Sequence, residues 1–306
     1  MNVPYPGIWR QLNAGQVVPF LGAGASLVGR SGPKPWTGLS SNCLPTAGEL
    51  ADFLATESVF PSEEQYDRSD LAKVSSYYAE IMGRTRLRQL LREVLSRDLQ
   101  PGPLHRLLAG LAVNQIIVST NYDTLIEQAF QEAGKPYDLV VYPTDKPELA
   151  NSVMWWRHGE PKPDFVAPNS LAVDLTKKSL IYKMHGTVVP KMGEFDSYVV
   201  TEDDYVEFLS RMSSAVPSLL LDLFRTRSFL FLGYGLRDWN LRVVLKNVSR
   251  HLINRRDEDL PSWAIQLHPS ELERVLWERR KVFIFDVDLQ SFVTKLQGQD
   301  AASAGH

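Results

Sequence analysis

The sequence predicts an α/β fold in which a mostly parallel sheet is covered by helices on both faces. Short apolar, β-branched segments alternate with segments of helical periodicity, and this alternation is typical of parallel sheets. Ligands of such folds bind at the carboxyl ends of the strands, so polar residues at those ends are the candidates for function. We expect strands at 17–21, 115–119, 139–142, 180–184, 228–233, 263–267 and 282–286, and helices at 121–133, 202–212, 217–225, 238–248 and 270–280.

Two segments interrupt this alternation. Residues 67–99 have helical spacing without a strand, which predicts a small inserted helical subdomain. One large domain then comprises 1–66 and 100–297, and 298–306 form a flexible tail. Residues 143–176 are rich in Pro, Asp, Lys and Trp and predict a long loop. Its Trp155 and Trp156 make it a candidate lid or contact surface, with an ordinary structured surface loop as the alternative.

Composition limits the classes of function. The chain has 306 residues, 44% hydrophobic and 23% charged, which is ordinary for a soluble globular protein. A net charge of -3 provides no global basic field for nucleic acid. Arg84, Arg86, Arg88 and Arg92 form either a local basic face or a solvated helix face.

Metal, disulfide and membrane classes are also disfavoured. The single cysteine, Cys43, excludes an intrachain disulfide and a four-cysteine zinc site, and the six histidines show no close pairing. We therefore expect no metal. The polar N-terminal segment does not resemble a signal peptide, and no apolar run reaches the ~18 residues that a membrane helix needs. We expect a cytoplasmic protein with no membrane contact.

A turn of small residues, Gly22-Ala23-Gly24-Ala25-Ser26, follows the first expected strand. Such a turn lets a pyrophosphate approach main-chain N–H groups, although a tight turn packed against the sheet would look the same. Leu27 and the lack of a suitable acidic partner argue against a dehydrogenase. No Gly-Lys-Ser/Thr follows, which excludes a triphosphate-binding P-loop, and Val28 disfavours a hydrolase nucleophile elbow.

Three other strand ends carry polar or glycine residues. The first is crowded with polar side chains, of which helix capping explains only one. At the second, a histidine precedes a glycine; at the third, a glycine precedes a tyrosine. Because the carboxyl ends of parallel strands share one edge of the sheet, we expect these residues to lie together. They are Ser119, Thr120, Asn121 and Asp123, then His185, then Gly233 and Tyr234.

The ordered set of motifs resembles the sirtuin superfamily. Gly-Ala-Gly-Ala-Ser at 22–26, Ser-Thr-Asn-Tyr-Asp at 119–123 and Lys-Met-His-Gly at 183–186 occur in that family's order and roughly its spacing. Segments 201–205 and 232–238 look like its bacterial sirtuin-like branch, many of whose members degrade NAD in antiphage defence. The resemblance covers about residues 16–290 and implies a Rossmann-like NAD-binding domain.

The resemblance also implies a role for each matching position. Gly22, Ala23, Gly24 and Ser26 match the pyrophosphate loop, whereas Gly233 and Tyr234 match the loop at the adenosine half of NAD. Asn121 matches the asparagine beside the nicotinamide ribose, Asp123 the aspartate near the carboxamide, and His185 the histidine on the ribose face. Thr120 stands at a cofactor position where deacylating sirtuins carry glutamine.

Other departures bear on the substrate. Of the family's Ile-Pro-Asp segment, only Pro45 is preserved. Both zinc-binding cysteine pairs are missing, so the helical segment 67–99 is expected in place of the zinc module. These departures weaken the case for peptide binding more than the case for NAD binding.

The resemblance implies an NAD hydrolase that cleaves the nicotinamide–ribose bond to give nicotinamide and ADP-ribose, depleting NAD as an antiphage effector. The cleavage builds oxocarbenium character on the ribose, as in glycoside hydrolysis. We expect Asn121 to position ribose or water, and His185 to act as a general base or to polarise the ribose hydroxyls. The alternatives are an NAD-dependent protein deacylase and a non-catalytic sensor of NAD or ADP-ribose.

An unrestrained NAD hydrolase would be toxic, so an active member of this family should be gated. We expect a homo-oligomer, or a separate partner such as a helicase-type ATPase or a nucleic-acid-guided protein. No direct sequence-specific binding of nucleic acid is expected.

Overall fold

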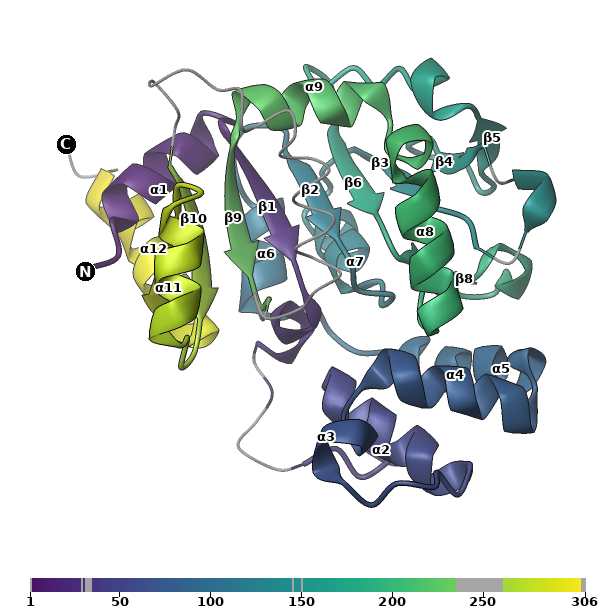
Figure 1. Ribbon diagram of the computed structural model, residues 1–306. Helices are drawn as coiled ribbons and strands as arrows, with labels where there is room; N and C mark the ends of the chain where they lie inside the picture. The colour runs from purple at the N-terminus through teal and green to yellow at the C-terminus, as the bar shows by residue number, and fades with distance from the viewer. Residues whose placement is uncertain are drawn as a thin grey trace.

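The structure, a computed structural model, describes residues 2–28, 30, 35–144, 146–149, 151–234 and 261–303. Its centre is a sheet in which, over these residues, nine strands lie in the order β11-β10-β9-β1-β2-β6-β3-β4-β5 (Figure 1). Pairing is parallel from β11 to β3 and antiparallel for β4 and β5. The strands are β1 (Val17–Leu21), β2 (Ile116–Ser119), β3 (Tyr137–Val141), β4 (Val153–Trp156), β5 (Asp164–Val166), β6 (Ser179–Lys183), β9 (Ser228–Leu232), β10 (Ser262–Gln266) and β11 (Val282–Asp286).

Helices cover both faces of this sheet, so the predicted α/β class is confirmed. On one face, α1 (Tyr5–Asn13), α6 (Pro103–Ala109), α7 (Leu125–Glu132) and α12 (Leu289–Ser303) pack on residues such as Val17 and Leu21. On the other, α8 (Glu202–Ala215), α9 (Ser218–Thr226) and α11 (Glu271–Glu278) pack on residues such as Val18 and Phe20. The alternation along β1 follows from the two-residue period of a strand. The expected helix at 238–248 lies outside the described residues.

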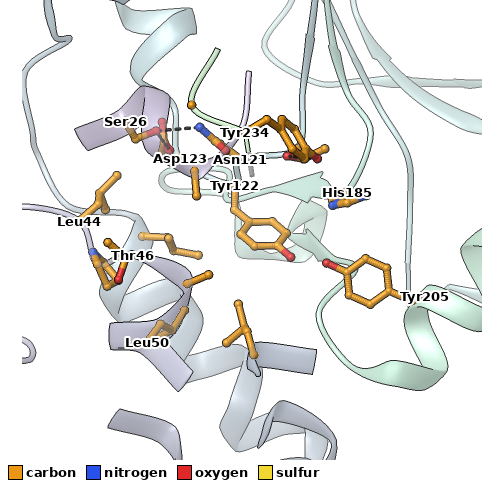
Figure 2. A pocket seen from close by; sticks show the side chains of 17 residues that line it. Ser26, Leu44, Thr46, Leu50, Asn121, Tyr122, Asp123, His185, Tyr205 and Tyr234 are labelled. Atoms are coloured by element: carbon orange, nitrogen blue, oxygen red, sulfur yellow. Dashed lines mark hydrogen bonds between the residues drawn. The ribbon is translucent and has the colours of Figure 1, made fainter. Parts of the chain in front are cut away.

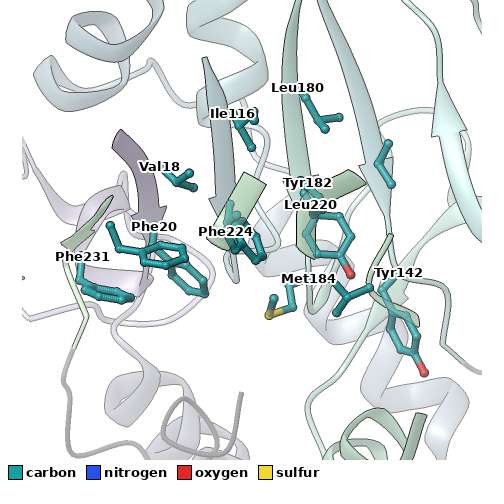
Figure 3. Packing of buried hydrophobic residues seen from close by; sticks show 14 of the residues in the cluster. Val18, Phe20, Ile116, Tyr142, Leu180, Tyr182, Met184, Leu220, Phe224 and Phe231 are labelled. Carbon is teal, nitrogen blue, oxygen red and sulfur yellow. The ribbon is translucent and has the colours of Figure 1, made fainter. Parts of the chain in front are cut away.

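The core on the second face is rich in aromatic side chains. Phe20 of β1 packs against Phe231 of β9 with ring centroids 5.5 Å apart, and Phe224 of α9, in the same cluster, packs against Phe229 of β9 at 5.3 Å (Figure 3). Each fully buried side chain of this size contributes roughly 1.5–3 kcal/mol. The central strands are therefore held rigidly, and their carboxyl ends form a fixed platform.

A separate group of helices lies beyond the carboxyl ends of the strands (Figure 1). It contains α2 (Ala47–Glu57), α3 (Gln65–Arg68), α4 (Leu71–Met82) and α5 (Arg84–Leu95). Of these, α2, α4 and α5 share a core that includes Leu54, Tyr78 and Leu91. A capping box at Thr46 starts α2, and the Asp70 side chain caps α4. We call residues 44–95 the helical unit. It is larger than the predicted insertion at 67–99 because α2 packs within it.

The segment 143–176 differs from the predicted long loop. It contains β4 and β5, which extend the sheet as an antiparallel edge, together with the 3-10 turns η2 (Pro147–Leu149) and η3 (Pro168–Ser170). Trp155 and Trp156 are buried on β4, and the Trp155 indole N–H donates to Asp138 at 2.9 Å. The candidate lid is therefore wrong, because both tryptophans belong to the sheet. At the C-terminus, α12 runs to Ser303, well into the segment expected to be a tail.

Candidate active site

A cavity of about 340 Å³ opens between the carboxyl ends of the strands and the helical unit (Figure 2). This volume is within the range typical of small-molecule sites. Eight of the residues predicted from sequence line it: Ala23, Ser26, Thr120, Asn121, Asp123, His185, Gly233 and Tyr234. The other lining residues are Leu44, Pro45, Thr46, Ala47, Leu50, Leu71, Leu95, Tyr122 and Tyr205.

The sheet register explains why residues so distant in sequence converge. Leu21 at the end of β1 pairs with Ser119 of β2 and Leu232 of β9, and Ser119 pairs with Lys183 of β6. Four parallel strands therefore end at one level, and the residues that follow each of them enter the same space. Ligands of parallel α/β folds bind at the carboxyl ends of the strands, which we call the strand-end rule, and this is the location that the rule predicts.

Asn121, Ser26 and Asp123 form one polar chain along the cavity wall. The Asn121 side-chain N–H₂ donates to the Gly22 carbonyl at 2.9 Å and to the Ser26 hydroxyl at 2.8 Å. Ser26 in turn donates to Asp123 Oδ2 at 2.7 Å, and Asp123 Oδ1 accepts from Leu125 N–H at 3.0 Å. Because the Gly22 carbonyl can only accept, the amide orientation is fixed, which leaves Asn121 Oδ1 available as an acceptor.

Gly22 and Gly24 have a packing role that the sequence could not reveal. The Gly22 N–H donates to Leu232 O at 3.0 Å, and the Gly24 N–H donates to Gly233 O at 2.9 Å. A Cβ on Gly22 would lie 2.6 Å from the Tyr234 ring, and one on Gly24 would lie 2.8 Å from Gly233 Cα. Gly233 itself has φ +68°. The glycines thus let the two turns cross, and Ala23 and Ser26 are the members of the first turn that line the cavity.

Thr120 and Tyr234 join these crossing turns at the cavity wall. The Tyr234 hydroxyl donates to Thr120 Oγ1 at 3.0 Å, and the Thr120 N–H donates to Leu21 O at 3.0 Å. The Tyr234 ring also packs edge-on against Phe20, with centroids 5.4 Å apart. Position 120 therefore couples the ends of β1 and β9.

His185 is buried at the opposite wall, with 5% of its surface exposed. Its ring packs edge-on against Tyr205 and Phe208 of α8, with centroids 5.4 and 5.5 Å away, and its backbone carbonyl accepts from Val199 N–H at 2.8 Å. Burial lowers the pKa of His185 to about 3, so the imidazole is neutral at physiological pH. Its Nε2 is buried without a hydrogen-bond partner among the described residues. Such an atom in a cavity wall is suited to binding a ligand.

Two tyrosines contribute to the site although sequence reasoning did not select them. In Figure 2 the rings of Tyr122 and Tyr205 lie beside His185. The Tyr122 hydroxyl donates to Val199 O at 2.5 Å, and burial raises the pKa of Tyr122 well above its ordinary value. Tyr122 lies between Asn121 and Asp123, so its position after a buried strand was the available signal. Tyr205 ends the segment 201–205 that resembles the family, which was its signal, and the packing of α8 brings it to the site.

A buried ion pair supports the site from behind. Lys183, the last residue of β6, has no exposed surface, and its Nζ lies 3.1 Å from Glu127 Oε1 of α7. The same ammonium donates to the Asp123 backbone carbonyl. Burial is the largest influence on Glu127 and raises the pKa of that carboxyl. A lysine in an otherwise apolar strand was a signal for this pair, because a buried charge needs a partner.

Two further classes of site are limited by the described part of the chain. There, no group of three or more His, Cys, Asp and Glu side chains is arranged to hold a metal ion. Within the same residues, no helix has the length and apolar character required to cross a membrane.

Comparison with known proteins identifies relatives of this chain. A family model described as "SIR2-like domain" matches residues 115–285. "NAD(+) hydrolase ThsA" of Enterococcus faecium is 27% identical over 83% of this chain and 44% of its own length. "Defense-associated sirtuin 2" of Bacillus subtilis is 23% identical over 74% of this chain and 20% of its own length. The chain thus spans less than half the length of these relatives.

A solved structure described as "Structural Basis for the Mechanism and Regulation of Sir2 Enzymes" superposes over the full length of both chains. Its sequence identity is 12% and its TM-score is 0.48.

Proposed function

Because the chain belongs to the SIR2-like domain family, we propose that it hydrolyses NAD at the nicotinamide–ribose bond. The observation that carries this proposal is the buried, unpartnered Nε2 of His185 in the wall of a cavity that Asn121 and Asp123 also line. Two relatives with "NAD(+) hydrolase" and "sirtuin" in their names support the same substrate. In this proposal NAD enters as the substrate.

The reaction takes NAD⁺ and water to nicotinamide, ADP-ribose and a proton. The nicotinamide–ribose bond breaks with its electron pair going to nicotinamide, and a water oxygen forms the new bond to the ribose carbon. Positive charge develops on the ribose as the bond breaks. A site for this reaction has to orient the sugar, admit one water and avoid placing a cation beside the reacting carbon.

We assign Asn121 to the ribose or the attacking water. Both of its amide hydrogens are held by Gly22 and Ser26, so its Oδ1 is the atom left to accept a hydroxyl or water proton in a hydrogen bond. Since Ser26 and Asp123 fix the amide, little reorganisation is needed when the substrate binds.

We assign His185 to the ribose hydroxyls as a neutral hydrogen-bonding group. A pKa of about 3 makes the imidazole a weak base, which favours polarising a hydroxyl over accepting its proton outright. Neutrality also matters electrostatically, because an imidazolium at this wall would oppose the cationic transition state. The expected choice between general base and polariser therefore moves toward the polariser.

We assign Asp123 to the nicotinamide carboxamide, and Ala23 and Ser26 to the pyrophosphate side of the cavity. The Asp123 carboxylate is held at both oxygens by Ser26 and Leu125 and retains lone pairs that can accept an amide N–H. Gly22 and Gly24 support this arrangement indirectly, since their N–H groups are already used between the two turns. Thr120, Gly233 and Tyr234 are proposed for the adenosine side.

The deacylase and sensor alternatives are separated by one assay. The protein is incubated with NAD alone and with NAD plus an acyl-peptide, and released nicotinamide is quantified. Release with NAD alone supports the hydrolase, release only with peptide supports the deacylase, and tight NAD binding without release supports the sensor.

We propose an antiphage effector role in the cytoplasm, gated by homo-oligomerisation or by a separate partner of the helicase-type ATPase or nucleic-acid-guided class. The relative with "Defense-associated" in its name supports the role. Size-exclusion chromatography at several concentrations, read with NAD turnover, tests gating by self-assembly. Full-rate turnover by a monomer would exclude it.

A further inference from the structure

The arginines of α5 form a row that the proposed reaction does not use. Arg84, Arg88 and Arg92 are spaced four residues apart, so they lie on one face of the helix. Each reaches across to the segment 196–204, which leads from η4 (Gly193–Phe195) through β8 (Ser197–Tyr198) into α8. Neither expected alternative, a local basic face or a solvated helix face, describes these three arginines, because their guanidinium groups bond to another segment of the chain.

The contacts of this row are specific. Arg84 donates to Asp204 Oδ1 at 2.9 Å and to Tyr198 O at 3.3 Å. Arg88 donates to Asp196 O at 2.9 Å, and its guanidinium lies 5.7 Å from the Tyr198 ring centroid.

Arg92 completes the row. It donates to Asp196 Oδ2 at 2.6 Å and to Val189 O at 3.2 Å. The carboxylates that accept from Arg84 and Arg92 are Asp204 and Asp196, whose side chains are 10% and 5% exposed. Replacing Arg84 or Arg92 by a neutral residue would therefore leave a nearly buried carboxylate without its ion-pair partner.

Both aspartates also organise the backbone of the 196–204 segment. Asp196 accepts from Val189 N–H at 2.7 Å and from the Tyr198 hydroxyl at 3.0 Å. Asp204 accepts from the N–H groups of Val200 and Thr201 at 2.9 and 2.8 Å, at the start of α8. Each arginine thus bonds to a residue that fixes a turn.

Segment 196–204 also supports the wall of the cavity that contains His185. Val199 N–H donates to the His185 carbonyl at 2.8 Å, and Val199 O accepts from the Tyr122 hydroxyl. One turn into α8, Tyr205 and Phe208 pack on the His185 ring. A shift of segment 196–204 would consequently move both the backbone and the ring contacts of His185.

We propose that Arg84, Arg88 and Arg92 are positioning residues through which the helical unit fixes segment 196–204 and thereby the imidazole of His185. This inference rests on the proposed function of His185. The helical unit then does more than form one wall of the cavity, because it also orients the group that acts on the ribose at the other wall.

The test compares Arg84→Ala and Arg92→Ala with Arg86→Ala, in the full chain. Arg86 lies on the same helix, but its side chain is 44% exposed and its ion-pair partner, Glu93, lies 4.0 Å away on α5 itself. We expect kcat for NAD hydrolysis to fall ~10–100-fold in the first two variants, since small misplacements of catalytic groups have effects of this size. We expect the KM for NAD to change less than kcat, and Arg86→Ala to match the wild type.

A second readout does not depend on turnover. NMR titration of the His185 imidazole should give a pKa shifted upward toward the ordinary value in Arg84→Ala and Arg92→Ala, because the aromatic wall of α8 loosens. If the wild type releases no nicotinamide, the proposed function fails while this titration still decides the positioning role. If the alanine variants do not fold, Arg84→Lys and Arg92→Lys replace them, since lysine keeps the charge but not the two-pronged contact.

The result that would overturn the positioning role is a purely structural effect. In that case Arg84→Ala and Arg92→Ala would lower the free energy of unfolding while leaving kcat and the His185 titration as in the wild type.

Discussion

At the residue scale, the site depends on a few atoms whose orientation is fixed by their hydrogen-bond partners. Asn121 is the clearest example, because its N–H₂ bonds the Gly22 carbonyl and the Ser26 hydroxyl. Its Oδ1 therefore faces the remaining direction, toward the cavity. Chemical identity at this position matters more than volume.

Asn121→Asp keeps the shape of the side chain but places a carboxylate oxygen 2.9 Å from the Gly22 carbonyl. We expect kcat to fall ~10²-fold or more, and the free energy of unfolding to fall by about 1–3 kcal/mol. Steady-state kinetics and chemical denaturation measure the two effects. Asn13→Asp, which breaks a similar amide-to-carbonyl bond to Trp9 far from the site, is the control and should leave kcat unchanged.

Two buried histidines make stability depend on pH. Burial lowers the pKa of His185 to about 3 and is the largest influence lowering that of His105 to about 4. Below about pH 6.5 the unfolded chain binds protons at both positions and the folded protein does not. Their stabilisation is therefore complete above pH 6.5 and is lost as the pH falls toward 4, by about 2 kcal/mol per histidine at pH 5.

Denaturation of the wild type and His105→Asn between pH 6.5 and 5 tests this dependence. The asparagine can still accept from Gly102 N–H, as His105 does. We expect the slope of unfolding free energy against pH to fall by close to one proton in the variant. Equal slopes would contradict the assignment, and His158→Gln at an exposed position controls for losing any histidine.

At the scale of elements, two glycine turns cross at the ends of β1 and β9. Gly24→Ala would place a Cβ 2.8 Å from Gly233 Cα, where only backbone could yield. We expect the free energy of unfolding to fall by about 2 kcal/mol or more. The same change at Gly298 in α12 meets open space and should raise stability by roughly 0.5–1 kcal/mol. Similar effects at both positions would contradict the crossing.

The tryptophans of β4 provide a second test at this scale. Trp155→Phe removes the indole N–H that bonds buried Asp138. We expect a loss of about 1–3 kcal/mol in unfolding free energy and an unchanged kcat and KM for NAD. If the segment closed over the substrate, these kinetic constants would change instead.

Many of the strands and turns were predictable from the sequence, and the exceptions have physical reasons. The expected strand at 17–21 coincides with β1, because its apolar run is buried on both faces. β4 was missed because it has only four residues and lies in a segment rich in Pro and charged residues. The packing role of Gly24 depends on β9 lying beside β1, a long-range pairing that local sequence does not contain.

At the scale of the whole molecule, the site lies between the sheet and the helical unit, and both contribute walls. The strand-end rule predicted which sheet residues would meet, and all four strand ends do so at one cavity. Leu44, Leu50 and Leu95 on the other side were not predicted, because the docking of the helical unit is a tertiary contact. The catalytic and binding roles of the strand-end residues stay predictions.

The central claim is cleavage of NAD by the groups at this cavity. The most direct measurement is chromatographic analysis of products after incubating NAD with the wild type, Asn121→Ala and His185→Ala, each shown to be folded. We predict equal amounts of nicotinamide and ADP-ribose from the wild type and a loss of nearly all release in both variants. Wild-type rates in folded Asn121→Ala and His185→Ala, or no release by the wild type, would contradict it.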